Sequence, residues 1–227
     1  MKKLLICIAL CWAVFSADVS AQQNPRRVTA VGIDVFKNVP YLLFPTFFGG
    51  KNALIIEPTI QFATTKPNRF TNLTVGYSQI DQERDNNGRT LHYVRGFHFQ
   101  LMQERQDNEG KLFWAYGALV AVGYGRGAIQ IKGDFFPTYL APLPDFSGAG
   151  LGIKFQGGTN YDFGKHWRLR TSINLSLNTF DYGKANPAYL PGAGPFPSSS
   201  SRNFSYTGGL NLQIFYLTKQ KAIYAPK

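Results

Sequence analysis

From residue 28 onward the chain alternates between apolar and polar positions, a period of two that predicts β-strands. The last such segment shows the alternation most clearly. Its apolar positions carry Phe204, Tyr206, Gly208, Leu210, Leu212, Ile214 and Tyr216. The positions between them carry Asn203, Ser205, Thr207, Gly209, Asn211 and Gln213. Because successive side chains of a strand point to opposite faces, the segment predicts one apolar wall and one polar wall.

The same pattern predicts about eight strands along the chain. They cover residues 28–36, 53–64, 70–80, 90–104, 112–124, 149–162, 167–178 and 203–216. The connections between them alternate in length. The short ones lie at 66–68, 106–110 and 162–165, and the long ones at about 37–52, 81–89, 125–148 and 181–202. We therefore expect the tight turns at one end of the sheet and the long loops at the other.

Two segments depart from the regular pattern. In 90–104, Arg95 shares a face with apolar residues such as Phe97 and Phe99, so we expect a bulge or a shifted start in this strand. Pro58 interrupts another strand and is tolerable only where its missing N–H is not needed.

The first 21 residues have the layout of a cleaved secretory signal peptide. Lys2 and Lys3 precede an apolar run, 4–15, and 19–21 read Val-Ser-Ala, a small-x-small cleavage pattern. An anchoring helix is the alternative, but the run is shorter than the roughly 20 residues that span a bilayer. We expect a signal peptide at 1–21, one domain at 22–218, and a short basic periplasmic tail at 219–227.

Both cysteines, Cys7 and Cys11, lie inside the predicted signal, and neither follows a small residue as a lipoprotein site requires. The exported chain would have no disulfide to stabilise it. Its net charge would change only from +11 to +10, since cleavage removes Lys2, Lys3 and Asp18. Export argues against nucleic acid as the partner of this basic chain. An anionic glycolipid surface fits it better, and charge spread over loops without a ligand remains the alternative.

A secreted β-sandwich also alternates, so the choice between sandwich and barrel depends on other features. The polar faces hold mainly Ser, Thr, Asn, Gln and Gly, where a solvated face would carry many Lys and Glu. Bulky aromatic residues mark the strand ends, as in the two interfacial girdles of membrane barrels. The predicted girdle consists of Tyr77, Trp114, Tyr124, Tyr161, Trp167, Tyr206 and Tyr216. We therefore predict an all-β, closed antiparallel transmembrane barrel with short periplasmic turns and long external loops.

In this strand pattern the chain resembles the small outer-membrane barrels of Gram-negative bacteria of the OmpA, OmpX and OmpW type. The resemblance covers residues 28–217 and involves no sharp motif. One departure is that Phe215 and Tyr216 are followed by a basic tail, although such barrels often end at an aromatic residue. The resemblance implies location in the outer membrane more than any activity.

A barrel of about eight strands is filled by its own side chains. The inward positions include the charged residues Asp34, Glu57, Lys154, Asp162, Arg168 and Arg170. Buried charges need partners, so we predict a paired network in the lumen, with Asp162 and Arg168 pairing across a tight turn. The network is either structural or part of a gated proton or ion path.

The residues offer little support for enzymatic chemistry. Some small barrels modify lipid A with a histidine, a serine and an acidic residue near the outer leaflet. His92 and His98 share a face near the external end of their strand, but no neighbouring serine completes a His-x-Ser pattern, and His166 falls on a periplasmic turn. No catalytic, metal-binding or cofactor-binding residues are predicted, and no cofactor is expected.

The long loops are rich in aromatic residues and proline and poor in charge. The residues that stand out are Phe44, Phe47, Phe48, Phe135, Phe136, Tyr139, Tyr189 and Phe196. Such loops pack on one another as a lid, extend the lipid-facing wall, or dock a partner, for example another envelope protein. The tract 198–202 is expected to be a flexible tip.

The expected function is that of a non-enzymatic outer-membrane protein, structural or partner-binding through these loops, in contact with outer-membrane lipid and lipopolysaccharide. The alternatives are a lipid A-modifying enzyme, an acyl hydrolase or transferase, and a narrow, porin-like channel for small solutes. The oligomeric state is left open.

Overall fold

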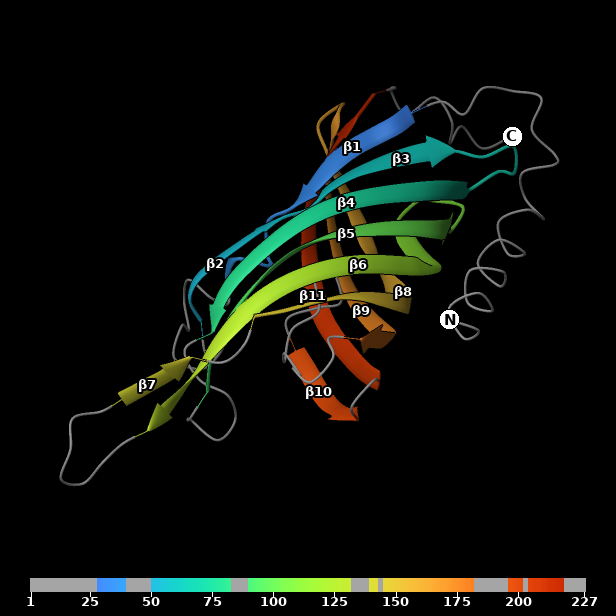
Figure 1. The fold of residues 1–227 in the computed structure, drawn as a ribbon. Coiled ribbons are helices and arrows are strands. Elements are labelled where there is room, and N and C mark those ends of the chain that lie inside the picture. Colours follow the sequence, from blue (N-terminus) through green and yellow to red (C-terminus); the bar gives the residue numbers. More distant parts are fainter. Residues whose placement is uncertain are drawn as a thin grey trace.

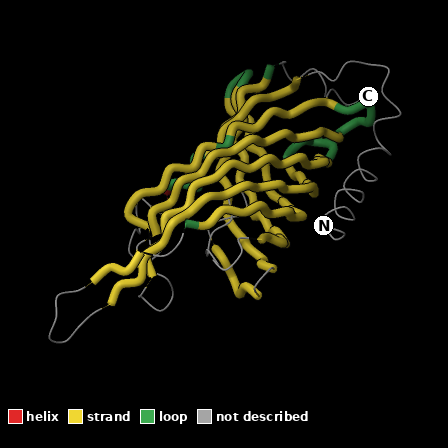
Figure 2. The backbone as a smooth tube through the Cα atoms, in the orientation of Figure 1, coloured by secondary structure: helices red, strands yellow, loops and turns green. Residues whose placement is uncertain are grey.

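A computed structural model describes residues 28–39, 50–82, 90–131, 139–142, 145–181, 196–201 and 204–218. The predicted signal peptide, most of the long-loop residues and the basic tail lie outside these ranges. Nearly all the described residues are in strands (Figure 2). In the described part of the chain, no helix has the length and apolar character needed to cross a membrane.

Eleven strands form one antiparallel sheet (Figure 1). They are β1 (Val28–Asp34), β2 (Gly50–Ile56), β3 (Pro58–Ala63), β4 (Arg69–Gln82), β5 (Thr90–Gln106), β6 (Leu112–Ile131), β7 (Tyr139–Pro142), β8 (Phe146–Phe163), β9 (Trp167–Asp181), β10 (Phe196–Ser201) and β11 (Phe204–Leu217).

Eight of these strands close into a barrel in the order β1, β3, β4, β5, β6, β8, β9, β11. The closing contact is the antiparallel pairing of β1 with β11, from Ala30 opposite Leu217 to Asp34 opposite Gln213. The other three strands extend this ring: β2 continues β3 along β4, β7 pairs with the end of β6, and β10 pairs with β11. The predicted closed antiparallel barrel of about eight strands is confirmed.

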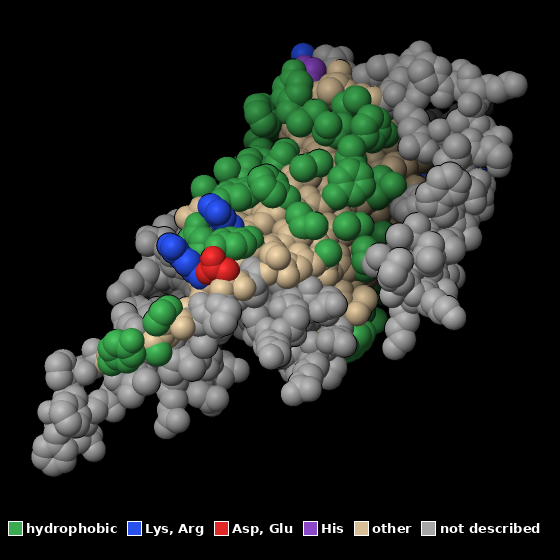
Figure 3. All heavy atoms as spheres, viewed as in Figure 1, with side chains coloured by type: hydrophobic (Ala, Val, Ile, Leu, Met, Phe, Trp, Pro, Cys, Tyr) green, Lys and Arg blue, Asp and Glu red, His purple; other side chains and the backbone are tan. Residues whose placement is uncertain are grey.

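The alternation of the sequence becomes an apolar exterior and a polar interior. On β9, Ile173 is 68 % exposed on the outside, whereas its neighbour Asn174 is 2 % exposed in the lumen. The same division holds on β11, where Leu210 is exposed and Asn211 is buried. Figure 3 shows apolar side chains over much of the visible barrel wall. This arrangement is the reverse of a soluble protein, whose apolar side chains face inward.

The three predicted tight turns are confirmed. Each contains a residue in the left-handed backbone region: Asn68 at φ 57°, Gly110 at φ 70° and Gly164 at φ 70°. Glycine adopts this conformation without steric cost, and asparagine tolerates it better than most residues. The turns join β3 to β4, β5 to β6 and β8 to β9, so they lie at the same end of the barrel.

The prediction of a bulge or a shifted start in 90–104 is wrong, because β5 begins at Thr90 and shows no register shift. β5 pairs with β4 in unbroken register from Arg69 opposite Arg105 to Gln82 opposite His92, and its register with β6 is also continuous. Arg95 shares the outer face with Phe97 because it lies near the loop end of the strand, where a charged side chain can leave the apolar region.

Two loop predictions also need correction. The long loop expected at 125–148 is partly strand, because β6 continues to Ile131 and pairs there with β7. The flexible tip expected at 198–202 is largely β10, in which Ser198 pairs with Tyr206 and Ser201 with Phe204. In both segments the strand is defined by backbone pairing with a neighbouring strand, and the serine tract of β10 shows no alternation at all.

The interruption at Pro58 is confirmed. β2 ends at Ile56 and β3 begins at Pro58, with Glu57 between them. Beyond this point β1 has ended, and the side chain of Asn38 replaces a strand partner. Its amide nitrogen donates to the Ile55 carbonyl at 2.8 Å, and its Oδ1 accepts from the Ile55 N–H at 2.7 Å.

Candidate functional site: the polar lumen

A buried ion pair between Glu104 and Arg170 occupies the turn-end half of the lumen. Glu104 comes from the inward face of β5 and Arg170 from that of β9, three places further round the barrel. The guanidinium donates two hydrogen bonds to the carboxylate, from Nη1 to Oε2 at 2.8 Å and from Nη2 to Oε1 at 2.9 Å. Each residue is only 2 % exposed. This two-pronged geometry is the strongest form of a charge-assisted hydrogen bond.

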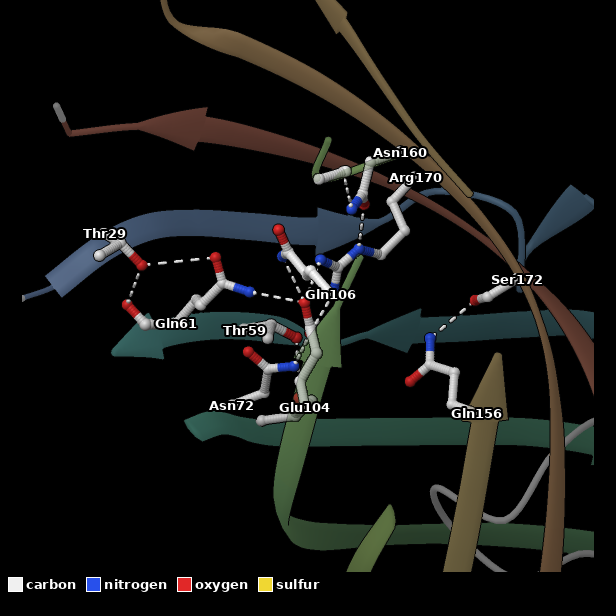
Figure 4. Close-up of polar contacts among 12 residues, drawn as sticks. Thr29, Thr59, Gln61, Asn72, Glu104, Gln106, Gln156, Asn160, Arg170 and Ser172 are labelled. Atoms are coloured by element: carbon white, nitrogen blue, oxygen red, sulfur yellow. Dashed lines mark hydrogen bonds and ion pairs between the residues drawn. The ribbon is translucent and has the colours of Figure 1, made fainter. Parts of the chain in front are cut away.

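Neutral amides supply the remaining hydrogen bonds that the two ions need (Figure 4). Asn72 donates to Glu104 at 2.5 Å, Gln106 at 2.6 Å and Gln61 at 3.2 Å. The Nε of Arg170 donates to Asn160 Oδ1 at 2.8 Å. A buried ion pair is favourable only when its lone pairs and protons are satisfied in this way.

Aromatic rings complete the cluster. The Arg170 guanidinium carbon lies 4.0 Å from the ring centroid of Phe113 and 4.8 Å from that of Phe215. Phe215 fits because β1 has glycine at position 32, where a Cβ would come within 2.5 Å of the Phe215 ring. Cation–π attraction strengthens when the cation is desolvated, as it is here.

The cluster reaches every strand of the closed barrel. Its members come from β1 to β11: Thr29, which donates to Gln61 at 3.4 Å, then Gln61, Asn72, Glu104, Phe113, Asn160, Arg170 and Phe215. The lumen network therefore links all eight strands of the barrel through side chains as well as through the backbone.

A second charge cluster lies nearer the loop end, around Glu57. Lys37 donates to Glu57 Oε2, and His98 Nε2 lies 3.3 Å from Glu57 Oε1. All three side chains are almost fully buried. The His98 ring lies over Gly76 of β4, where a Cβ would meet its Cε1 at 2.0 Å. Lys154, predicted in the lumen network, is buried and donates to Gln100 at 3.0 Å.

The Asp162–Arg168 pair predicted across the tight turn is present. Arg168 Nε donates to Asp162 Oδ1 at 2.6 Å, and Nη2 donates to Oδ2 at 3.2 Å. Asp34 behaves differently from the predicted ion pairing. Its Oδ1 accepts from the backbone N–H groups of Phe36 at 2.9 Å and Lys37 at 3.3 Å, so it caps the turn that follows β1.

Sequence reasoning missed the acidic partner of Arg170. Glu104 lies on the inward face of β5 together with His98, Gln100 and Met102, and an unbroken alternation through this segment would have placed it there. The expected bulge hid this signal. Lys37 carried no comparable signal, because it lies beyond the end of β1 and reaches the lumen from a turn.

The predicted girdle residues divide between the two ends of the barrel. Trp114, Tyr161, Trp167 and Tyr216 are exposed near the tight turns, and Trp167 meets Tyr216 edge to face at 5.4 Å. The three other girdle residues lie on the outer wall toward the loop end: Tyr77, Tyr124 and Tyr206.

Most of the predicted loop residues lie outside the residues that the structure describes. Those outside the described residues are Phe44, Phe47, Phe48, Phe135, Phe136 and Tyr189. Tyr139 is exposed on β7, and Phe196 begins β10 opposite Gly208.

The histidines occupy different environments. His98 is buried in the lumen, and His166 contacts the Leu217 carbonyl oxygen at 3.1 Å beside a tight turn. Only the backbone of His92 is described, in β5 opposite Gly127. Within the described ranges, no three His, Cys, Asp or Glu side chains are grouped so that they could hold a metal ion.

An apolar exterior, a polar lumen and complete closure define the class: this is a membrane β-barrel of eight antiparallel strands. No protein-family model matches the chain, and no curated protein matches it significantly. Among solved structures, the chain is similar to the crystal structure of Neisserial surface protein A (NspA), with 12 % identity over 85 % of this chain and 99 % of that one, and a TM-score of 0.37. The class therefore rests on the strand pairing and burial of this chain.

Proposed function

We propose that the protein is a non-enzymatic, integral outer-membrane barrel, exported by a cleaved signal peptide, that acts as a rigid anchor for the segments at its loop end. The observation that carries the proposal is the inverted burial of the strands. Apolar residues such as Phe97, Val122 and Ile153 are exposed, while charged residues such as Glu104 and Arg170 are buried. Lipid is the solvent that makes this distribution favourable.

The test is the solvent requirement of the folded chain. Residues 22–227 should fold and stay monodisperse in detergent micelles or lipid bilayers and should aggregate in buffer without them. Circular dichroism and size-exclusion chromatography measure both properties. A folded, soluble monomer in plain buffer would overturn the proposal.

The loop end is where the anchor would meet other molecules. There the β6–β7 hairpin extends past the barrel wall (Figure 1), and Tyr139 on it is exposed. Long aromatic, proline-rich connections join the strands at this end. A partner protein of the envelope should therefore co-purify in mild detergent and be lost when residues 132–138 are replaced by a short glycine-serine linker. Unchanged co-purification would exclude this hairpin as the docking element.

A further inference from the structure

Two arginines and two tyrosines form a compact patch on the outside of the barrel. On the adjacent strands β5 and β6, Tyr93 is directly opposite Arg126, and Arg95 is directly opposite Tyr124. Each guanidinium carbon lies 5.2 Å from the centroid of the ring opposite it. The two arginines are diagonal neighbours on one face, a relation that separates residues by roughly 7–8 Å.

The height of this arginine–tyrosine patch matches a membrane interface. Trp114, at the turn end of β6, and Tyr124 are ten residues apart on the same strand. At ~3.3 Å per residue and a strand tilt of ~40°, ten residues rise about 25 Å. That is the height of the apolar band of an outer-membrane barrel, about 25 Å. The patch therefore lies at the level of the lipid headgroups on the loop side.

The surface next to the patch suits acyl chains. Toward the turn end, the outer face of β5 continues with Phe97, Phe99 and Leu101, and that of β6 with Val122 and Val120. Figure 3 shows basic side chains and an acidic one at the border of the apolar surface, toward the end where β6 and β7 extend. A ligand with an anionic head and apolar tails would fit both parts at once.

The guanidinium groups are arranged to bind an oxyanion. An arginine that stacks on an aromatic ring keeps the N–H groups at its edge free to donate, and these match the oxygens of a phosphate. Among the side chains that the structure describes, no carboxylate lies within 4.0 Å of either guanidinium. The carboxylate of Asp145 accepts a hydrogen bond from the hydroxyl of Tyr124 at 2.5 Å.

We propose that Arg95 and Arg126 bind the phosphate groups of a phosphorylated glycolipid of the outer leaflet, whose acyl chains lie along β5 and β6. This inference depends on the proposed outer-membrane location, because that leaflet supplies the glycolipid. A soluble phosphorylated ligand would make no use of the apolar surface directly beneath the arginines.

The test compares lipid binding by three forms of the folded protein in detergent. The first is the unmodified chain, and the second is Arg95→Gln/Arg126→Gln. The matched control is Arg69→Gln/Arg105→Gln, which removes an equal charge from two exposed arginines directly opposite each other at the turn end of β4 and β5. The probes are bisphosphorylated lipid A and the same lipid with both phosphates removed, and native mass spectrometry measures the bound fraction.

The unmodified chain and the Arg69/Arg105 control should bind bisphosphorylated lipid A at least tenfold more tightly than the dephosphorylated lipid. The Arg95/Arg126 variant should lose this preference. Equal binding of the two lipids by the unmodified chain, or an equal loss in both variants, would overturn the inference. Either result would leave the membrane proposal intact, since that proposal fails only if the chain folds in plain buffer.

Discussion

Glu104 illustrates how a charge is kept inside a narrow barrel. Its carboxylate accepts hydrogen bonds from Arg170, Asn72, Gln106 and Gln61. Removal of one member of a buried pair leaves the other as an uncompensated charge, whereas replacement of both by apolar groups often costs little. The cluster should therefore respond very differently to single and double substitutions.

Substitution of Glu104 by Gln should destabilise the barrel by about 3–5 kcal/mol, because Arg170 stays charged without a counter-ion. The double variant Glu104→Leu/Arg170→Met should lose less than the single variant. Urea unfolding in lipid vesicles, followed by tryptophan fluorescence, measures both. As a control, Lys111→Ala breaks the exposed pair with Glu109 and should leave the unfolding midpoint unchanged. A midpoint for Glu104→Gln equal to that of the control would refute the structural role.

Gly76 provides a second test at the residue scale. A methyl group there would meet the His98 ring at 2.0 Å, whereas at Gly157, on the outer wall, the nearest atom is 3.8 Å away. Gly76→Ala should cost about 1–3 kcal/mol, as overpacking usually does, and Gly157→Ala should be close to neutral. The same unfolding assay compares the two. Equal stability would mean that His98 has room to move aside.

At the scale of elements, the sequence predicted the strands that alternate and missed those that do not. β8, β9 and β11 were placed almost correctly because each keeps apolar and polar residues on separate faces. β10 has four successive serines, so its pairing with β11 comes from the neighbouring backbone and leaves no pattern to read. Side chains alternate because a strand of the barrel wall has lipid on one face and the polar lumen on the other. A short strand outside the wall does not separate these two environments.

The charged residues of the lumen could be predicted only where their strands alternate. Arg168, Arg170 and Lys154 were placed in the lumen because their strands alternate cleanly. Which charges meet across the lumen depends on how the sheet closes, and alternation contains no information about that. The sequence could predict only pairs that flank the same tight turn, such as Asp162 and Arg168.

The outer wall makes a depth-dependent prediction. Ile173 lies six residues along β9 from the interfacial Trp167, close to the middle of the apolar band. Ile173→Arg should cost about 2–4 kcal/mol, whereas Leu112→Arg, beside a tight turn, should cost about 0–1 kcal/mol. Both residues are more than half exposed, so a soluble protein would tolerate both changes. Refolding into vesicles of defined thickness measures the difference, and equal costs would contradict a membrane-spanning wall.

At the scale of the whole molecule, the lumen is crossed by its own side chains. The Glu104–Arg170 pair joins β5 to β9, and Phe113 and Phe215 pack against it from β6 and β11. An eight-stranded barrel has just enough interior to be filled in this way. The barrel is thus filled by side chains and has no open interior across the bilayer.

A filled lumen predicts electrical silence. Reconstituted in a planar bilayer, the purified protein should give no conductance steps above those of lipid alone. The measurement uses 1 M KCl, an ionic strength on the order of tenfold above that at which screening is already strong. Glu104→Gln should also remain silent, because its side chain keeps the same volume. Stable, reproducible steps from the unmodified chain would revive the channel alternative.

The pairing of β1 with β11 ties the beginning of the chain to its end. Without residues 204–217, Val28–Asp34 has a neighbour on only one side, and the edges of β1 and β9 stay open. A product that stops short of β11 has no stable place in lipid, because its backbone groups stay unpaired. A truncated copy that lacks β11 should therefore fail to insert, and its two open strand edges should make it prone to aggregation.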